Sequence, residues 1–201
     1  MYFDRLFALE KELKAHPDIV LESFNINPPL EEHKLANVKH DALRHLYAQA
    51  NGFSLDWYAE LSGEEPIQGR VRLAGYARDN DDLWDHFDEN HEPRSAREKP
   101  SFIINDRSFP GCGSFYAYLN ADGEVFFVAS LDDIIDAKMN VAEYLDALFI
   151  SRGLVTLHGA LFTDRTGHQW TTDYERFCFS METLFQDSTF RQSLFKYHRT
   201  P

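Results

Sequence analysis

The densest group of ionisable side chains lies between residues 79 and 91, where six carboxylates and two histidines occur together. Carboxylate oxygens and imidazole nitrogens can jointly hold a divalent cation. The spacing is not that of an EF-hand loop, because no glycine stands at the sharp turn. His86 and His91 are five residues apart, so they do not share a helical face. Such a segment can be a metal site, a solvated acidic face or a surface that docks another protein.

Two large aromatic side chains, Trp84 and Phe87, stand among these charges. Aromatic anchors ringed by charged groups are typical of protein–protein hot spots, so they favour a docking surface. We therefore expect the partner-binding site to consist of Asp79, Asp81, Asp82, Trp84, Asp85, Phe87, Asp88 and Glu89.

A second candidate for chemistry is Cys112, which sits in a tight loop after Pro110. A thiol nucleophile needs a base beside it in space, and sequence spacing cannot show that distance. The sequence has no GxSxG, GxGxxG, P-loop or HExxH motif. We expect Cys112 and Cys178 to be free thiols, and we expect no catalytic residue, metal or cofactor. Trp57 and Trp170 lie in apolar or alternating patterns, so both are expected in the core.

The net charge of the chain limits the classes of molecule that it can bind. The 201 residues include 20 basic and 33 acidic side chains, a net charge of −13, and most of the excess lies between residues 51 and 150. Nucleic acid and anionic membranes should be repelled, because binding phosphate requires a basic surface. A basic protein would be attracted and steered by the same field. The alternative is that the acidity only keeps the protein in solution.

Apolar spacing predicts the elements of the first half of the chain. Residues 2–15 have the period of an amphipathic helix that stops before Pro17, and Pro28-Pro29 makes residues 18–34 irregular. Four apolar residues spaced four apart, from Val38 to Ala50, predict a helix that ends at Asn51-Gly52. Alternation predicts strands over residues 53–58 and 67–75.

The second half is expected to contain three more strands, over residues 101–105, 114–119 and 124–129, with a hairpin turn at residues 120–123. Asn140 and Glu143 have the spacing of a capping box for a helix that stops at Gly153. The same spacing at Thr172 and Glu175 predicts a helix in the C-terminal segment.

Strands in succession joined by short turns predict an α+β fold with a central twisted, mainly antiparallel sheet flanked by helices. We expect one domain over residues 1–153 and a C-terminal helical extension over residues 154–201 that packs on it. No apolar run approaches the ~18 residues that a membrane span needs. The chain opens without a charged and apolar leader, so the cytoplasm is the expected compartment.

The middle of the chain resembles a known superfamily. Residues 46–53 join a helix to a strand through an Asn-Gly corner, and Trp57 and the strand at 67–73 follow. Further on come the glycine-containing loop at 111–113, the hairpin strands and the helix that begins near Asn140. This order is similar to the SUKH superfamily, which includes bacterial toxin-immunity proteins and a yeast cell-wall regulator. The similarity covers roughly residues 35–153.

The resemblance implies an α+β fold whose central twisted sheet is flanked by helices, and no enzymatic activity. It also implies a protein that binds a cognate intracellular bacterial toxin directly, possibly a nuclease, which the acidity of this chain would suit. Two alternatives remain: an intracellular regulatory scaffold, and a metal-dependent hydrolase that uses the acidic cluster at 79–91. The sequence gives neither the identity of the toxin nor the oligomeric state.

Overall fold

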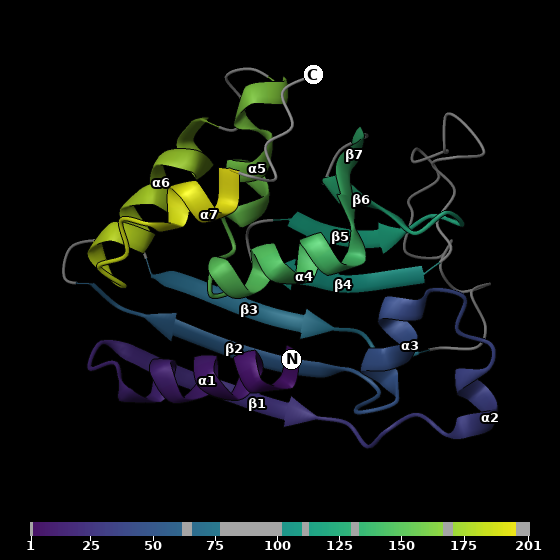
Figure 1. The fold of residues 1–201 in the computed structure, drawn as a ribbon. Helices are drawn as coiled ribbons and strands as arrows, with labels where there is room; N and C mark the ends of the chain where they lie inside the picture. Colours follow the sequence, from purple (N-terminus) through teal and green to yellow (C-terminus); the bar gives the residue numbers. More distant parts are fainter. Residues whose placement is uncertain are drawn as a thin grey trace. The chain divides into compact units, whose positions relative to one another are not determined.

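The computed structural model describes residues 2–61, 66–76, 102–109, 113–129, 133–166 and 171–195 (Figure 1). In chain order the elements are α1 (Tyr2–Ala15), β1 (Ile19–Ile26), α2 (Glu32–Leu35), α3 (Asp41–Tyr47), β2 (Phe53–Ala59), β3 (Ile67–Leu73), β4 (Phe102–Phe109), β5 (Gly113–Leu119), β6 (Glu124–Ala129), β7 (Asp133–Asn140), α4 (Val141–Ile150), α5 (Leu157–Thr166), α6 (Thr171–Thr183) and α7 (Phe190–Phe195).

The predicted α+β fold is confirmed, but the prediction of a single sheet is wrong. The described strands form a three-stranded sheet in the order β1-β2-β3 and a four-stranded sheet in the order β4-β5-β6-β7. Residue contacts also divide the chain into two compact units. Unit 1 comprises Met1–Asn25, Ser54–Val71 and Leu145–Pro201, and unit 2 comprises Ile26–Phe53 and Arg72–Tyr144. The predicted domain boundary at residue 153 stays a prediction.

The far edge of β3 is paired in part with a segment that is not one of the named strands. The N–H of Arg70 donates to the carbonyl of Gly153 at 2.7 Å, and the N–H of Val155 donates to the carbonyl of Gln68 at 3.1 Å. Gly69 and Leu154 form an antiparallel bridge between them. This part of the edge is therefore already hydrogen-bonded, so no further strand can pair with it. Alternation reveals a strand, but not which backbone will occupy its edge.

In unit 1, the helix α1 buries Leu6, Leu9 and Leu13, which share one face at helical spacing. The strand β2 alternates buried and half-buried residues along its whole length, as its sequence predicts. Trp57 lies on the buried face with only 1% of its surface exposed. Its ring meets that of Phe185 edge-on, with the centroids 5.5 Å apart. The prediction of a buried Trp57 is confirmed, and the C-terminal segment helps to bury it.

On the opposite face of the same sheet, polar side chains link the three strands. Ser23 on β1 donates to the Asp56 carboxylate on β2 at 2.7 Å, and Arg70 on β3 is ion-paired to the same carboxylate. Trp57 and Arg70 therefore lie on opposite faces, as the alternation predicts. The chain of contacts joins side chains that must stand side by side, so it fixes the register of the strands.

In unit 2, the four strands β4–β7 form an antiparallel meander. The predicted hairpin between β5 and β6 is confirmed: Asn120 accepts hydrogen bonds from the N–H groups of Asp122 and Glu124 at 3.0 and 2.9 Å. The rings of Tyr118 and Phe126 stack across these strands, with centroids 5.5 Å apart.

The capping box is also confirmed. The Asn140 side chain accepts from the N–H of Glu143 at 3.0 Å, and the Glu143 carboxylate accepts from the N–H of Asn140 at 2.9 Å. These reciprocal bonds satisfy donors that the start of α4 leaves without helical partners.

Five elements have no specific counterpart in the sequence prediction: β1, α2, β7, α5 and α7. The segment that holds β1 was expected to be irregular because of Pro28-Pro29, which follow the strand rather than interrupt it. β7 escapes detection because its ladder with β6 shifts register between Glu124 and Phe126. Lys138 in the same strand also has a positive φ of 55°. Such a bulge breaks the two-residue period on which strand prediction depends.

No helix in the described part of the chain is long and apolar enough to cross a membrane.

Candidate functional site

The predicted partner-binding residues, from Asp79 to Glu89, lie outside the described residues, as do Cys112, His86, His91 and Trp170. The acidic docking surface therefore stays a prediction. Cys178 is described, on α6, as a free and buried cysteine. Burial raises the pKa of its thiol above the ordinary value, against a hydrogen bond from Tyr174 and the charge of Arg191. A thiol held in its protonated form is a poor nucleophile.

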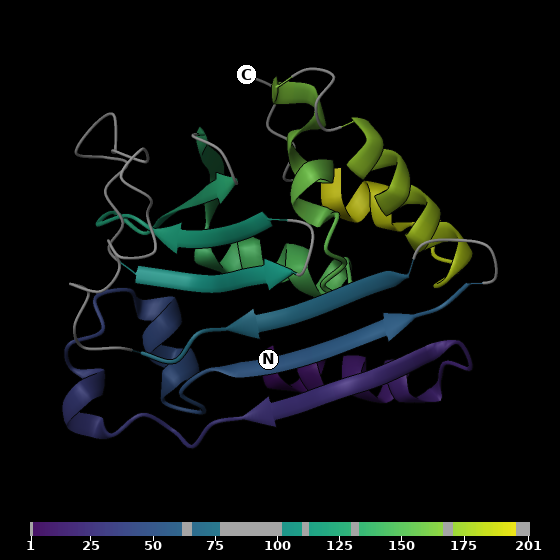
Figure 2. The same ribbon diagram turned by 180° about the vertical axis from the view of Figure 1, so that it is seen from behind.

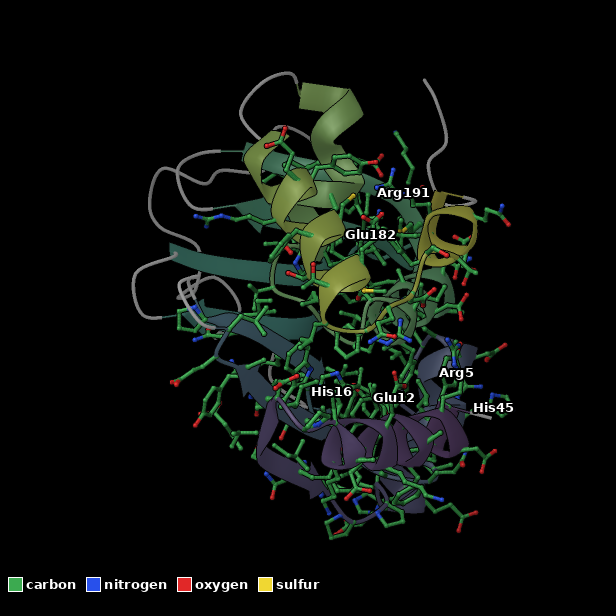
Figure 3. All side chains as sticks on the ribbon, turned by 90° about the vertical axis from the view of Figure 1, so that its left-hand side faces the viewer. Arg5, Glu12, His16, His45, Glu182 and Arg191 are labelled. Atoms are coloured by element: carbon green, nitrogen blue, oxygen red, sulfur yellow. The ribbon has the colours of Figure 1, made fainter. Side chains whose placement is uncertain are left out.

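The described residues do form one open groove, in unit 1, between α1, the end of α4 and α7. We call it the α1–α7 groove. Its volume is about 300 Å³, and its charged lining consists of Arg5, Glu12, Arg152 and Asp187. Leu9, Phe149 and Phe190 also line the groove, and each of them is almost fully buried. Figure 3 shows Arg5 and Glu12 projecting from α1.

Arg152 is the central side chain of the groove. Its Nε donates to Glu12 on α1 at 3.1 Å, and its Nη1 donates to Asp187, just before α7, at 2.9 Å. The guanidinium also lies 4.8 Å from the centre of the Phe185 ring, a cation–π geometry. One side chain thus connects two segments that are far apart in the sequence.

The backbone at the end of α4 places Arg152 in this position. Arg152 and Gly153 both have positive φ, 52° and 71°. The carbonyl of Arg152 accepts a hydrogen bond from Trp57 Nε1 at 2.8 Å. A Cβ on Gly153 would stand 2.4 Å from the carbonyl oxygen of Arg70, so only glycine fits there without a shift. The predicted helix stop at Gly153 is therefore also the point where the chain reaches the edge of β3.

The carboxylate of Asp187 is held in its charged form. Burial raises its pKa, but hydrogen bonds from Thr189 and Arg152 outweigh burial and leave the pKa below the ordinary value. Thr189 contributes its backbone N–H at 2.9 Å and its hydroxyl at 2.8 Å. Asp187 therefore remains an acceptor for Arg152 across the neutral pH range.

Arg5 forms the other end of the groove. Its guanidinium is ion-paired to Asp146 on α4 and lies 4.9 Å from the centre of the Phe149 ring. Tyr2, on the preceding turn, has a pKa raised by burial and by the charge of Asp146, in spite of Arg5. The groove thus offers guanidinium donors and carboxylate acceptors beside an apolar surface, and that combination can bind a polar group with an apolar body.

Sequence reasoning does not find this groove. Glu12 and Asp187 are 140 and 35 residues from Arg152 in the chain, so no local spacing connects them. The one local signal is Gly153, which predicts where the helix ends but not what the side chain before it will contact.

Two antiparallel sheets with flanking helices define the chain as an α+β protein. No known protein family, curated protein or solved structure matches it. The SUKH resemblance accordingly stays a prediction from the sequence.

Proposed function

We propose that this chain is a non-catalytic immunity protein that binds and neutralises a cognate intracellular bacterial toxin. The observation that carries the proposal is the distribution of charge. Residues 51–150 contain 8 basic and 20 acidic side chains, a net charge of −12 within a chain total of −13. A surface of that sign favours a basic partner and steers its approach.

The α+β class agrees with the SUKH resemblance, although the two separate sheets differ from the single central sheet that the resemblance implies. Toxins that cut nucleic acid are a fitting partner class, since a nuclease must be basic where it grips phosphate. An acidic inhibitor can occupy that surface by presenting charges of the sign that nucleic acid presents. The docking residues we propose are the eight predicted between Asp79 and Glu89.

The decisive experiment is co-expression with the product of the adjacent gene, followed by purification and an activity assay. We expect the two proteins to purify together and the partner's toxicity to be suppressed. A toxin that remains fully active beside a saturating amount of this chain would contradict the proposal. Stoichiometric uptake of a divalent metal by residues 79–91 would favour the hydrolase alternative instead.

The docking residues can be tested by measuring both rate constants. Steering charges act at a distance, so replacing Asp81, Asp82 and Asp85 by Asn should slow association, and less so at high salt. An aromatic anchor excludes water, so Trp84→Ala should speed dissociation instead. Unchanged rates at low salt in both variants would remove the docking role from this segment.

A further inference from the structure

The outer edge of β1 is exposed, whereas the outer edge of β3 is hydrogen-bonded to residues 153–155. In the described part of the chain β1 pairs only with β2, and Figure 2 shows it as the outermost strand of its sheet. Its eight residues contain no proline or lysine, which often protect edge strands, and Glu22 is its only charged residue. A long, regular edge of this kind can pair with another strand.

Two contacts fix which backbone groups face outward. The N–H of Asn27 donates to the carbonyl of Gly52 at 3.1 Å, and the Ser23 side chain meets Asp56. In an antiparallel pair of strands, residues that stand opposite each other in one register have residue numbers with a constant sum. Asn27 with Gly52 and Ser23 with Asp56 have the same sum, so the two contacts belong to one register. That register directs the N–H and C=O groups of Val20, Glu22 and Phe24 away from β2.

The side chains agree with this register. It places Phe24 on the sheet face that α1 covers, and the Phe24 ring meets that of Phe7 on α1 edge-on at 5.9 Å. Beyond that contact the surface is apolar but uncovered: Phe7 is 51% exposed and Val20 is 49% exposed.

The charges at this edge indicate which side chains a partner strand should carry. Asp18 and Glu22 are exposed on either side of Val20, and neither is ion-paired to a side chain that the structure describes. A second copy of this chain would bring carboxylates of the same sign to the shared edge, which is unfavourable. A strand with basic side chains would pair with them, and apolar side chains between the basic ones would cover Val20 and Phe7.

We propose that the free edge of β1 binds an extended segment of a partner protein by β-strand addition, and that basic and apolar side chains take turns along the one face of this segment that lies beside Asp18, Val20 and Glu22. Main-chain hydrogen bonds supply affinity in this mode of recognition, and alternate side chains supply specificity. The inference goes beyond the proposed function, because it places a binding surface on β1 that is separate from residues 79–89.

The test uses the full chain and a synthetic peptide of about ten residues, a length that matches one strand, in which lysine and valine take turns at every second position and threonine stands between them. We expect saturable binding at low salt, and slowed amide exchange at Val20, Glu22 and Phe24. The same peptide with glutamate in place of each lysine should bind at least about tenfold more weakly, since its charges have the same sign as those of the edge. Equal binding of both peptides, or no binding of either, would overturn the proposal.

Variants separate the backbone contribution from the charge. Glu22→Pro removes an outward N–H and should weaken binding of the lysine peptide by about tenfold or more, beyond the effect of Glu22→Gln. If Glu22→Pro folds poorly, Val20→Lys and Val20→Glu form a matched pair, of which only the lysine variant should lose binding. Lys11→Gln, one turn after Phe7 on α1, should not weaken it. Dimerisation of the chain that Glu22→Pro abolishes would identify a second copy as the occupant and refute the proposal.

Discussion

The two edges of the three-stranded sheet differ in whether another segment of the chain is hydrogen-bonded to them. At β3, backbone groups of residues 153–155 complete the hydrogen bonds of the edge. At β1, no described residue takes that position. The difference lies in what returns to each edge: residues 153–155 approach β3 closely, and no described segment approaches the outer edge of β1.

Two glycines permit that approach at β3. A Cβ on Gly69 would stand 2.2 Å from the Trp57 ring, so the strand needs a residue without a side chain there. Gly153 needs both its positive φ and its missing Cβ. β1 contains no glycine, no segment among the described residues returns to its outer edge, and Val20 on this strand is 49% exposed. The closed edge at β3 therefore depends on close packing. In the described part of the chain, no segment packs against the outer edge of β1.

The largest effect we expect is at Trp57, which links the buried face of β2 to the segment that closes β3. Trp57→Ala should lower the free energy of unfolding by about 3–5 kcal/mol, through lost burial and a cavity. It also leaves the Arg152 carbonyl without its 2.8 Å hydrogen bond. Denaturant unfolding measures the loss, and a value below ~1 kcal/mol would mean that the ring is not part of the core.

A double-mutant cycle with Gly69 sharpens that result. Gly69→Ala should destabilise the protein because its new methyl group meets the Trp57 ring. In the Trp57→Ala background the same methyl group has room, so the cost should fall by about 1 kcal/mol or more. Additive costs would show that the two residues do not compete for space.

The next effect tests the hydrogen bonds that close β3. Val155→Pro removes the N–H that donates to Gln68, and we expect it to cost about 1–3 kcal/mol. Val155→Ala is the control, because it shortens the side chain and keeps the N–H. Equal unfolding free energies for the two variants would mean that this bond contributes nothing.

A smaller effect concerns how the stability of the protein depends on pH. The pKa of Asp187 is lower in the folded chain than its ordinary value, so its stabilisation is present above about pH 4 and is lost as the pH falls through the folded pKa. Asp187→Asn should therefore cost about 1 kcal/mol at pH 7, and the difference from wild type should shrink below about pH 4. Unfolding measured across that range checks the direction, and a difference that grows on acidification would contradict it.

Local signals made much of the fold predictable. The helix at residues 2–15, the strands around Trp57 and Arg70, the hairpin at Asn120 and the capping box at Asn140 all depend on residues within a few positions of each other. Such patterns are complete within one element, so periodicity and turn chemistry are enough to find them.

The pairing of strands and the groove could not be predicted in this way. The far edge of β3 is occupied through a bridge between Gly69 and Leu154, which are far apart in the chain. The groove depends in the same way on Arg152 reaching Glu12 and Asp187. β1 itself was missed because Pro28-Pro29 lie close behind it, although its own residues are strong strand formers.

The smallest expected effect on stability is at the open edge. Glu22→Pro removes an N–H that the inferred register directs away from β2, so no hydrogen bond inside the sheet is lost. We expect the free energy of unfolding to change by less than about 1 kcal/mol, well below the cost of Val155→Pro. Ser23→Pro is the matched control, because its N–H faces β2 and its side chain bonds to Asp56. Removing that N–H should cost about 2 kcal/mol or more, as a proline within a paired strand does. If Glu22→Pro and Ser23→Pro were equally destabilising, the outward direction of the Glu22 N–H would be wrong, and with it the open edge that β-strand addition requires.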